Sequence, residues 1–87
     1  MNNPKTNIRK RLKEIIAEQL GLELELVSDD ASIADDLGAD SLEMVQIMME
    51  IEEAFEIEIQ DSVSEGLVTV DDTANFVAEI LAEQSRG

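Results

Sequence analysis

One serine in this sequence stands where a hydroxyl could carry a group that another protein transfers. Ser41 follows a turn that contains Gly38, and the periodic apolar pattern of a helix begins at the same point. The free N–H groups and the partial positive charge of a helix N-terminus favour a phosphate. The residue types therefore permit a phospho-group on Ser41, although position alone favours an ordinary serine in a first helical turn.

The composition limits what Ser41 could do by itself. The chain has no cysteine and no histidine, so it lacks a thiolate nucleophile, the commonest zinc ligands and the usual base that activates a serine. An enzyme built on paired carboxylates is the remaining catalytic alternative. No Asp/Glu pair is marked out from the others, and 87 residues are few for a walled active site. We expect that the protein is not an enzyme.

The acidic residues also raise the question of calcium. If Gly38 is aligned with the sixth position of an EF-hand loop, Ile33 falls first and Met44 twelfth, and neither can supply a side-chain ligand. The sequence therefore predicts no EF-hand and no metal site. Weak binding of divalent cations at Asp29–Asp30 or Asp35–Asp36, as a relief of charge repulsion, stays open.

Charge is distributed very unevenly along the chain. Six basic and 21 acidic residues give a formal charge of −15, and no Lys or Arg lies between Glu14 and Ser85. Five of the six cations precede Glu14: Lys5, Arg9, Lys10, Arg11 and Lys13. Such a surface repels nucleic acids and anionic membranes and attracts basic protein surfaces.

No part of the sequence reads as a membrane or export segment. Residues 1–11 contain no apolar run suited to a signal peptide, and no stretch approaches the roughly 20 apolar residues of a membrane span. The basic N-terminus continues directly into an amphipathic helix. We therefore expect one domain over residues 1–87, monomeric and cytoplasmic, without membrane insertion.

Three segments have the periodicity of helices, at about residues 5–20, 41–55 and 70–84. Gly21 is suited to end the first, and Thr69 with Asp72 forms a capping-box pattern before the last. Between the first two helices, Leu22 to Leu26 alternates apolar and acidic residues, and Phe55 to Ile59 does the same. Either segment could form a short strand, or the first could be an ordered loop held by its leucines.

The middle helix has an apolar arc wider than a surface helix needs. Asp40 is suited to be its N-cap with Glu43 at the third position. The side chains of this helix fall on three faces: a polar face (Glu43, Gln46, Glu50, Glu53), a core stripe (Ile47, Ile51, Phe55, with Met44 and Met48) and a third strip (Leu42, Val45, Met49). The third strip is either packed against a neighbour or exposed as a docking patch for basic partners. Met44 and Met48 could equally border an adaptable cavity between helices.

The segment Leu37-Gly38-Ala39-Asp40-Ser41-Leu42-Glu43 resembles the attachment motif of acyl carrier proteins of the dissociated fatty-acid type. The resemblance extends over most of the chain. It implies that Ser41, between Asp40 and Leu42, carries 4′-phosphopantetheine derived from coenzyme A, whose thiol holds acyl groups as thioesters. It also implies an all-α four-helix bundle of three longer helices and a short third helix at about residues 62–66, with a long loop between the first and second helices.

The resemblance further implies the surfaces of such a carrier. Basic patches of a phosphopantetheinyl transferase and of acyl synthases, reductases and acyltransferases would meet acidic contacts at Asp40, Glu43, Glu52, Glu53 and Asp61. Apolar contacts would come from Leu42, Val45 and Met49. The acyl chain would be sheltered by Ile47, Ile51, Phe55 and Ile59.

Several features depart from the family pattern, among them a denser N-terminal Arg/Lys cluster and the weakly helix-forming, less acidic Ser62-Val63-Ser64. Gln46 stands where an acid is usual, Gln60 replaces the proline common before the third helix, and Gly66 replaces a larger residue at that helix's end. These departures are consistent with a specialised carrier in fatty-acid synthesis or a related lipid or polyketide pathway. The alternative function is an unmodified acidic helical adaptor, which would share the docking face and lack the modification.

Overall fold

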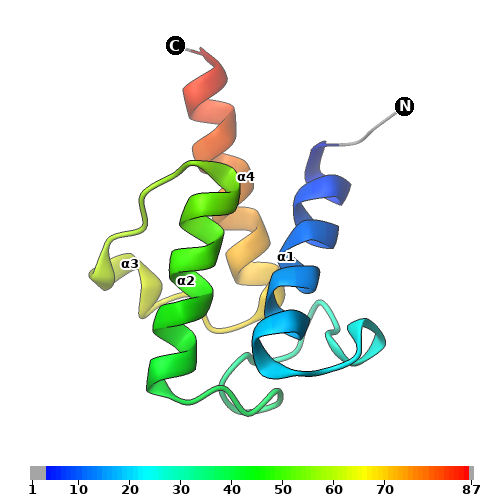
Figure 1. Ribbon diagram of the computed structural model, residues 1–87. Coiled ribbons are helices and arrows are strands. Elements are labelled where there is room, and N and C mark those ends of the chain that lie inside the picture. The colour runs from blue at the N-terminus through cyan, green and yellow to red at the C-terminus, as the bar shows by residue number, and fades with distance from the viewer. Residues whose placement is uncertain (1–3, 87) are drawn as a thin grey trace.

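The computed structural model describes residues 4–86, which form four α-helices and one short 3₁₀ helix (Figure 1). The helices are α1 (Pro4–Leu20), η1 (Leu24–Leu26), α2 (Ser41–Phe55), α3 (Asp61–Ser64) and α4 (Val70–Arg86). The described residues contain no strand, which confirms the predicted all-α four-helix class. None of their helices combines the length and apolar character needed to cross a membrane.

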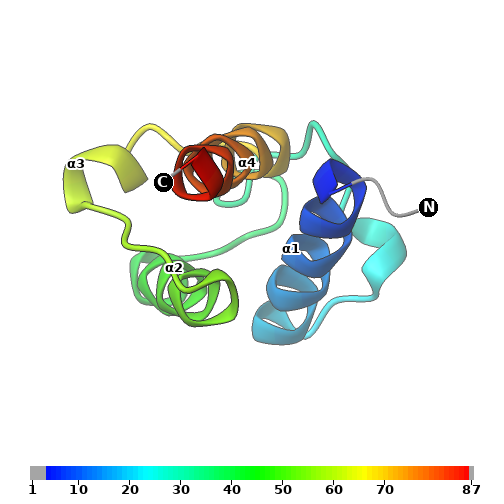
Figure 2. The ribbon, with the colours of Figure 1, turned by 90° about the horizontal axis from the view of Figure 1, so that it is seen from above.

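The three longer helices enclose the core, and α3 lies outside it. Seen from above, α1, α2 and α4 occupy three corners, and α3 lies beside α2 and α4, away from α1 (Figure 2). Helix α1 contacts both α4 and α2. The largest fully buried side chains at the centre are Leu12, Ile16, Ile33, Ile47, Ile51, Val70 and Val77. Burying one large aliphatic side chain contributes about 1.5–3 kcal/mol, so this cluster supplies most of the stabilisation.

Helix α3 spans Asp61–Ser64 rather than the expected residues 62–66. Gln60 is in an extended conformation and precedes the helix as its N-cap. The N–H of Gly66 then donates to the Val63 carbonyl at 2.9 Å, three residues back. This tighter turn ends the α-helix early and directs Leu67 into the core.

The first alternating segment forms neither a strand nor a loop held by its leucines. It becomes η1, in which Leu24 is 44% and Leu26 60% exposed. The long connection is anchored a few residues later, where Val27, Ala31 and Ile33 are buried. A period-2 pattern was misleading here because one turn of 3₁₀ helix can place leucines outward as well as inward.

The second alternating segment also forms no strand, although its two isoleucines are buried. Glu56 ends α2 with a left-handed backbone (φ 54°), and the chain then turns Ile57 and Ile59 inward. The N–H of Ile59 donates to a carboxylate oxygen of Glu52 at 2.8 Å, and this bond fastens the α2–α3 connection to α2.

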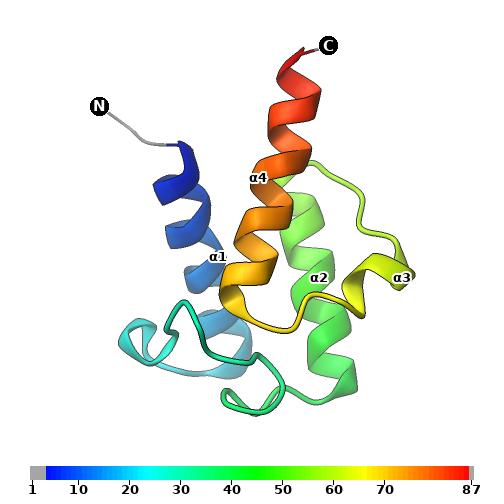
Figure 3. The ribbon, with the colours of Figure 1, turned by 180° about the vertical axis from the view of Figure 1, so that it is seen from behind.

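Backbone hydrogen bonds fix the long connection against the start of α4 (Figure 3). The N–H of Ile33 donates to the Val68 carbonyl at 3.0 Å, and the N–H of Val70 donates to the Ala31 carbonyl at 3.1 Å. The N–H of Asp71 donates to the Asp29 carbonyl at 2.8 Å. The chain that leads to Ser41 is thus held to the bundle before α2 begins.

The cations of α1 reinforce the same junction. Lys13 Nζ lies 2.7 Å from an Asp29 carboxylate oxygen, and Arg9 pairs with Asp71 and, at 3.6 Å, with Asp29. The hydrogen bond from Lys13 and the nearby Arg9 hold the pKa of the Asp29 carboxyl below its ordinary value, while Asp71 raises the pKa of Arg9. Every ion pair among the described side chains uses a cation of α1.

We predict that Asp29→Asn destabilises the protein at pH 7 by up to about 1 kcal/mol, the range of exposed ion pairs. Because the pKa of Asp29 is lower in the folded state, its contribution is present above its unfolded pKa of about 4 and is lost as the pH falls through the folded value. Urea denaturation at pH 7 and pH 3 measures this, with Asp30→Asn as control because exposed Asp30 has no ion-pair partner among the described residues. An equal effect of both substitutions at pH 7 would contradict the prediction.

Candidate functional site

Ser41 is exposed and is the first residue of α2, where a capping box holds the helix start. The N–H of Glu43 donates to Asp40 Oδ1 at 2.8 Å, and the N–H of Asp40 donates to Glu43 Oε1 at 3.1 Å. Two first-turn donors are satisfied in this way, while helix geometry leaves the N–H groups of Ser41 and Leu42 without a carbonyl partner inside the helix. The hydroxyl is therefore presented to solvent beside a locally positive helix end.

The turn before Ser41 gives the capping box its position. Gly38 has a left-handed backbone (φ 78°), which glycine adopts without steric cost. Its N–H donates to the Ala34 carbonyl at 3.1 Å, and the next N–H, of Ala39, donates to the Ile33 carbonyl at 3.1 Å. Ala39 is buried while Asp40 and Ser41 emerge. The turn thus fixes the direction in which the serine leaves the bundle.

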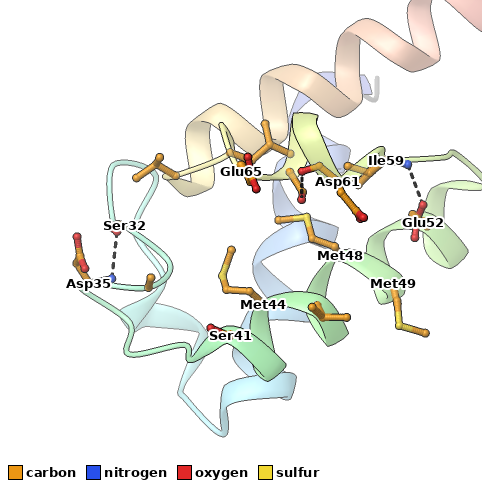
Figure 4. Close-up of a pocket in the computed structure, with 15 residues that line it drawn as sticks. Ser32, Asp35, Ser41, Met44, Met48, Met49, Glu52, Ile59, Asp61 and Glu65 are labelled. Carbon is orange, nitrogen blue, oxygen red and sulfur yellow. Dashed lines mark hydrogen bonds between the residues drawn. The ribbon is translucent and has the colours of Figure 1, made fainter.

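A groove of about 550 Å³ opens beside Ser41, between α2 and α3 (Figure 4). Met44 and Met48 face it from α2, and Ile59 and Leu67 line it from the connections on either side of α3. Its edges carry hydroxyl and carboxylate groups, of Ser32, Asp35, Asp61, Ser64 and Glu65. The site therefore combines an exposed hydroxyl at the mouth with an apolar lining behind it.

Of the four residues expected to shelter an acyl chain, only Ile59 lines this groove. Ile47 and Ile51 are fully buried in the central core, and Phe55 is half-buried against it. The isoleucine stripe faces the other long helices, and the neighbouring stripe of Met44 and Met48 faces α3. The structure agrees with the expectation that Met44 and Met48 border a cavity, and the acyl-sheltering role of Ile47, Ile51, Phe55 and Ile59 stays a prediction.

The third strip of α2 is exposed rather than packed. Leu42 is 65%, Val45 55% and Met49 56% exposed, and they form the patch that we call the α2 docking patch. The acids expected to contact partners together with this patch differ in whether their carboxylates are free or engaged in internal hydrogen bonds. Glu53 and Asp61 are exposed, whereas Glu43 belongs to the capping box and half-buried Glu52 holds the Ile59 N–H.

Two further polar side chains on this side of the molecule are engaged internally. Gln46, which stands in place of an acid, accepts a hydrogen bond from Gln19 Nε2 at 2.7 Å and links α2 to α1. Asp36 accepts the N–H of Ser32 at 2.7 Å. No group of three metal-ligating side chains converges anywhere in the part of the chain that the structure describes.

Sequence reasoning named Ile59 and Asp61 but missed other groove residues that come from outside α2. Ser32 and Asp35 belong to the long connection, and Leu67 and Val68 follow α3. They meet only because backbone hydrogen bonds join the connection to the start of α4. No local periodicity signals such a contact, so the sequence offered no means to find it.

Comparisons with known proteins agree with this geometry. Residues 10–77 match the family described as "Phosphopantetheine attachment site". An acyl carrier protein from Enterococcus faecalis, studied for its high thermal stability, has a similar structure, with a TM-score of 0.74 and 28% sequence identity. The match covers 86% of this chain and 95% of the Enterococcus chain.

We predict that Asp40→Ala lowers the free energy of unfolding by about 0.5–2 kcal/mol, the usual cost of removing an N-cap. Asp40→Asn should retain most of the stability because asparagine caps about as well as aspartate. Urea denaturation of the two variants and the wild type measures the difference. Equal destabilisation by Asn and Ala would mean that the charge of Asp40, and not its capping bond, stabilises the helix start.

Proposed function

The chain belongs to the phosphopantetheine attachment family, and we propose that it is an acyl carrier protein whose Ser41 hydroxyl holds the 4′-phosphopantetheine arm. Covalent attachment of that group defines the family, whose members are carriers and not enzymes. The observation that supports Ser41 most strongly is its position. It is an exposed hydroxyl on the first turn of a capped helix, at the mouth of an apolar groove.

The residues around Ser41 fit the group. A phosphodiester on the hydroxyl would lie next to the free N–H groups of the first turn of α2, which favour a phosphate. The arm, once attached, supplies the thiol that the chain itself lacks. Asp40 and Glu43 hold the serine in place, and activation of its hydroxyl falls to the transferase because the chain has no histidine.

The groove supports an acyl cargo. Met44, Met48 and Ile59 offer an apolar surface within reach of a chain that starts at Ser41, so the apolar part of the cargo is shielded from water there. Such a carrier serves fatty-acid synthesis or a related lipid or polyketide pathway. The internal bond of Gln46 to Gln19, where the family usually has a free acid, favours a specialised partner set.

The α2 docking patch supports transient binding of basic partner enzymes. Its three apolar side chains offer a small contact area, and Glu53 and Asp61 lie exposed near it. Charges at such a rim mainly raise association rates, and a few apolar anchors supply the affinity. The proposed partners are the phosphopantetheinyl transferase and the acyl synthases, reductases and acyltransferases, each of which binds the carrier transiently. The carrier itself is proposed to be monomeric and cytoplasmic.

We predict that the protein gains the mass of one phosphopantetheine when it is incubated with coenzyme A and a phosphopantetheinyl transferase. Ser41→Ala should abolish the gain, and Ser62→Ala, at an exposed serine of α3, should not. Intact-protein mass spectrometry measures both. An unchanged wild-type mass would favour the unmodified adaptor, and loading of Ser41→Ala would place the arm elsewhere.

We predict that Glu53→Lys lowers kcat/KM of the transferase severalfold more than Glu23→Lys does. Both substitutions change the net charge equally, but only Glu53 is on α2, and Glu43 is left intact to preserve the capping box. The difference should shrink as salt rises from about 0.05 to 0.5 M because exposed charges are screened. Equal losses in the two variants would show that α2 is not the docking face.

A further inference from the structure

The side chains most easily oxidised in this protein gather on one helix. The chain has no cysteine, tryptophan, tyrosine or histidine, and it has four methionines. Three of these lie within six residues of α2, at Met44, Met48 and Met49. Thioether sulfur is therefore the main target that the polypeptide offers to a peroxide.

The structure exposes these three sulfur-bearing side chains to different degrees. Met49 is 56% exposed, Met44 is half-buried, and Met48 is 7% exposed. All three side chains line the groove: Met44 and Met48 lie within it, and Met49 lies at its outer edge (Figure 4). Solvent therefore reaches Met49 first.

We propose that Met49 is a reversible oxidation site that disables the α2 docking patch. Hydrogen peroxide transfers one oxygen atom to the sulfur: the O–O bond breaks, an S–O bond forms, the sulfur loses two electrons, and the peroxide leaves as water. The sulfoxide is polar, so it replaces an apolar anchor between Val45 and the acidic rim with a group that must be desolvated on docking. A thiol-dependent methionine sulfoxide reductase returns the thioether.

Exposure selects Met49 among the three methionines, while charge and cargo limit which oxidants arrive and which other sulfur atoms compete. Glu50, Glu52 and Glu53 follow Met49 directly in the helix, and they repel anionic oxidants but not neutral peroxide. In the acylated carrier the thiol of the arm is bound as a thioester, so the methionines are the remaining target. The effect on docking rests on the proposed function, whereas the order of oxidation rests on exposure alone.

The order of oxidation tests the site directly. The 87-residue protein without the arm is treated with graded hydrogen peroxide, quenched with catalase and cleaved at glutamates, which releases residues 44–50 with the three methionines of α2. Fragment-ion mapping should show Met49 oxidised severalfold faster than Met44 and Met48 slowest, with the differences lost in concentrated urea. Oxidation of Met48 as fast as Met49 in the folded protein would overturn the proposal.

The effect on docking is measured by transferase loading. Protein oxidised at Met49 should show a kcat/KM that is about tenfold lower, mostly because KM rises. A tenfold change corresponds to about 1.4 kcal/mol of binding free energy. Incubation with both methionine sulfoxide reductases together should restore kcat/KM, because each enzyme reduces one of the two sulfoxide epimers. Met49→Leu and Met44→Leu are each compared with their own unoxidised forms: the first should be insensitive to mild peroxide, and the second should stay sensitive.

The outcomes separate the two hypotheses. Loading that is unchanged by the Met49 sulfoxide, or equally peroxide-sensitive in Met49→Leu, would overturn the switch while the carrier function stands. If the unoxidised protein is not loaded at all, the carrier function fails. In that case the peroxide mapping alone decides whether Met49 is the preferred oxidation site.

Discussion

The confinement of nearly all cations to α1 is the constraint on which the rest of the structure depends. Between Glu14 and Ser85 the chain has no positive charge, so the acids there repel one another without internal compensation. The described ion pairs therefore all originate from α1, and those of Arg9 and Lys13 hold the long connection and the first turn of α4. Elsewhere the fold is held by apolar burial, by backbone hydrogen bonds and by a few side-chain hydrogen bonds such as those of Gln46 and Glu52. The same segregation leaves acids as the only charged side chains of α2, so basic proteins can approach it.

The apolar arc of α2 is wide because it faces three different surroundings: the core, the groove and solvent. Ile47 and Ile51 fill the central core, Met44 and Met48 line the groove under α3, and Leu42, Val45 and Met49 face solvent. At 100° per residue, these sets are adjacent stripes on one helix. Ser41 at its N-terminus is thus rigidly related to the core, the groove and the α2 docking patch. A partner that contacts the patch meets the serine in a fixed orientation.

Features that depend on residues three or four positions apart could be predicted from the sequence, and those that depend on distant contacts could not. The capping box of Asp40 and Glu43 and the four-helix class could be predicted in this way. The outward turn of Leu24 and Leu26 and the lining of the groove could not. The acyl-lining role of Ile47 and Ile51 stays a prediction: both lie in the core and outside the groove, and periodicity identifies an apolar stripe without naming its neighbour. Only the position of α3 relative to α2 decides which stripe faces a cavity.

The composition of the docking patch suits a carrier that must leave each partner as readily as it meets it. As the proposed docking surface, three exposed apolar side chains would bury little area and give modest affinity, and the surrounding acids would accelerate encounter more than they prolong the complex. With so few anchors, each side chain carries a large share of the binding free energy. A change in the polarity of one, such as Met49, therefore affects docking more than the same change would in a large interface. The small number of apolar contacts that would permit rapid exchange between enzymes would also make the patch sensitive to oxidation of a single sulfur atom.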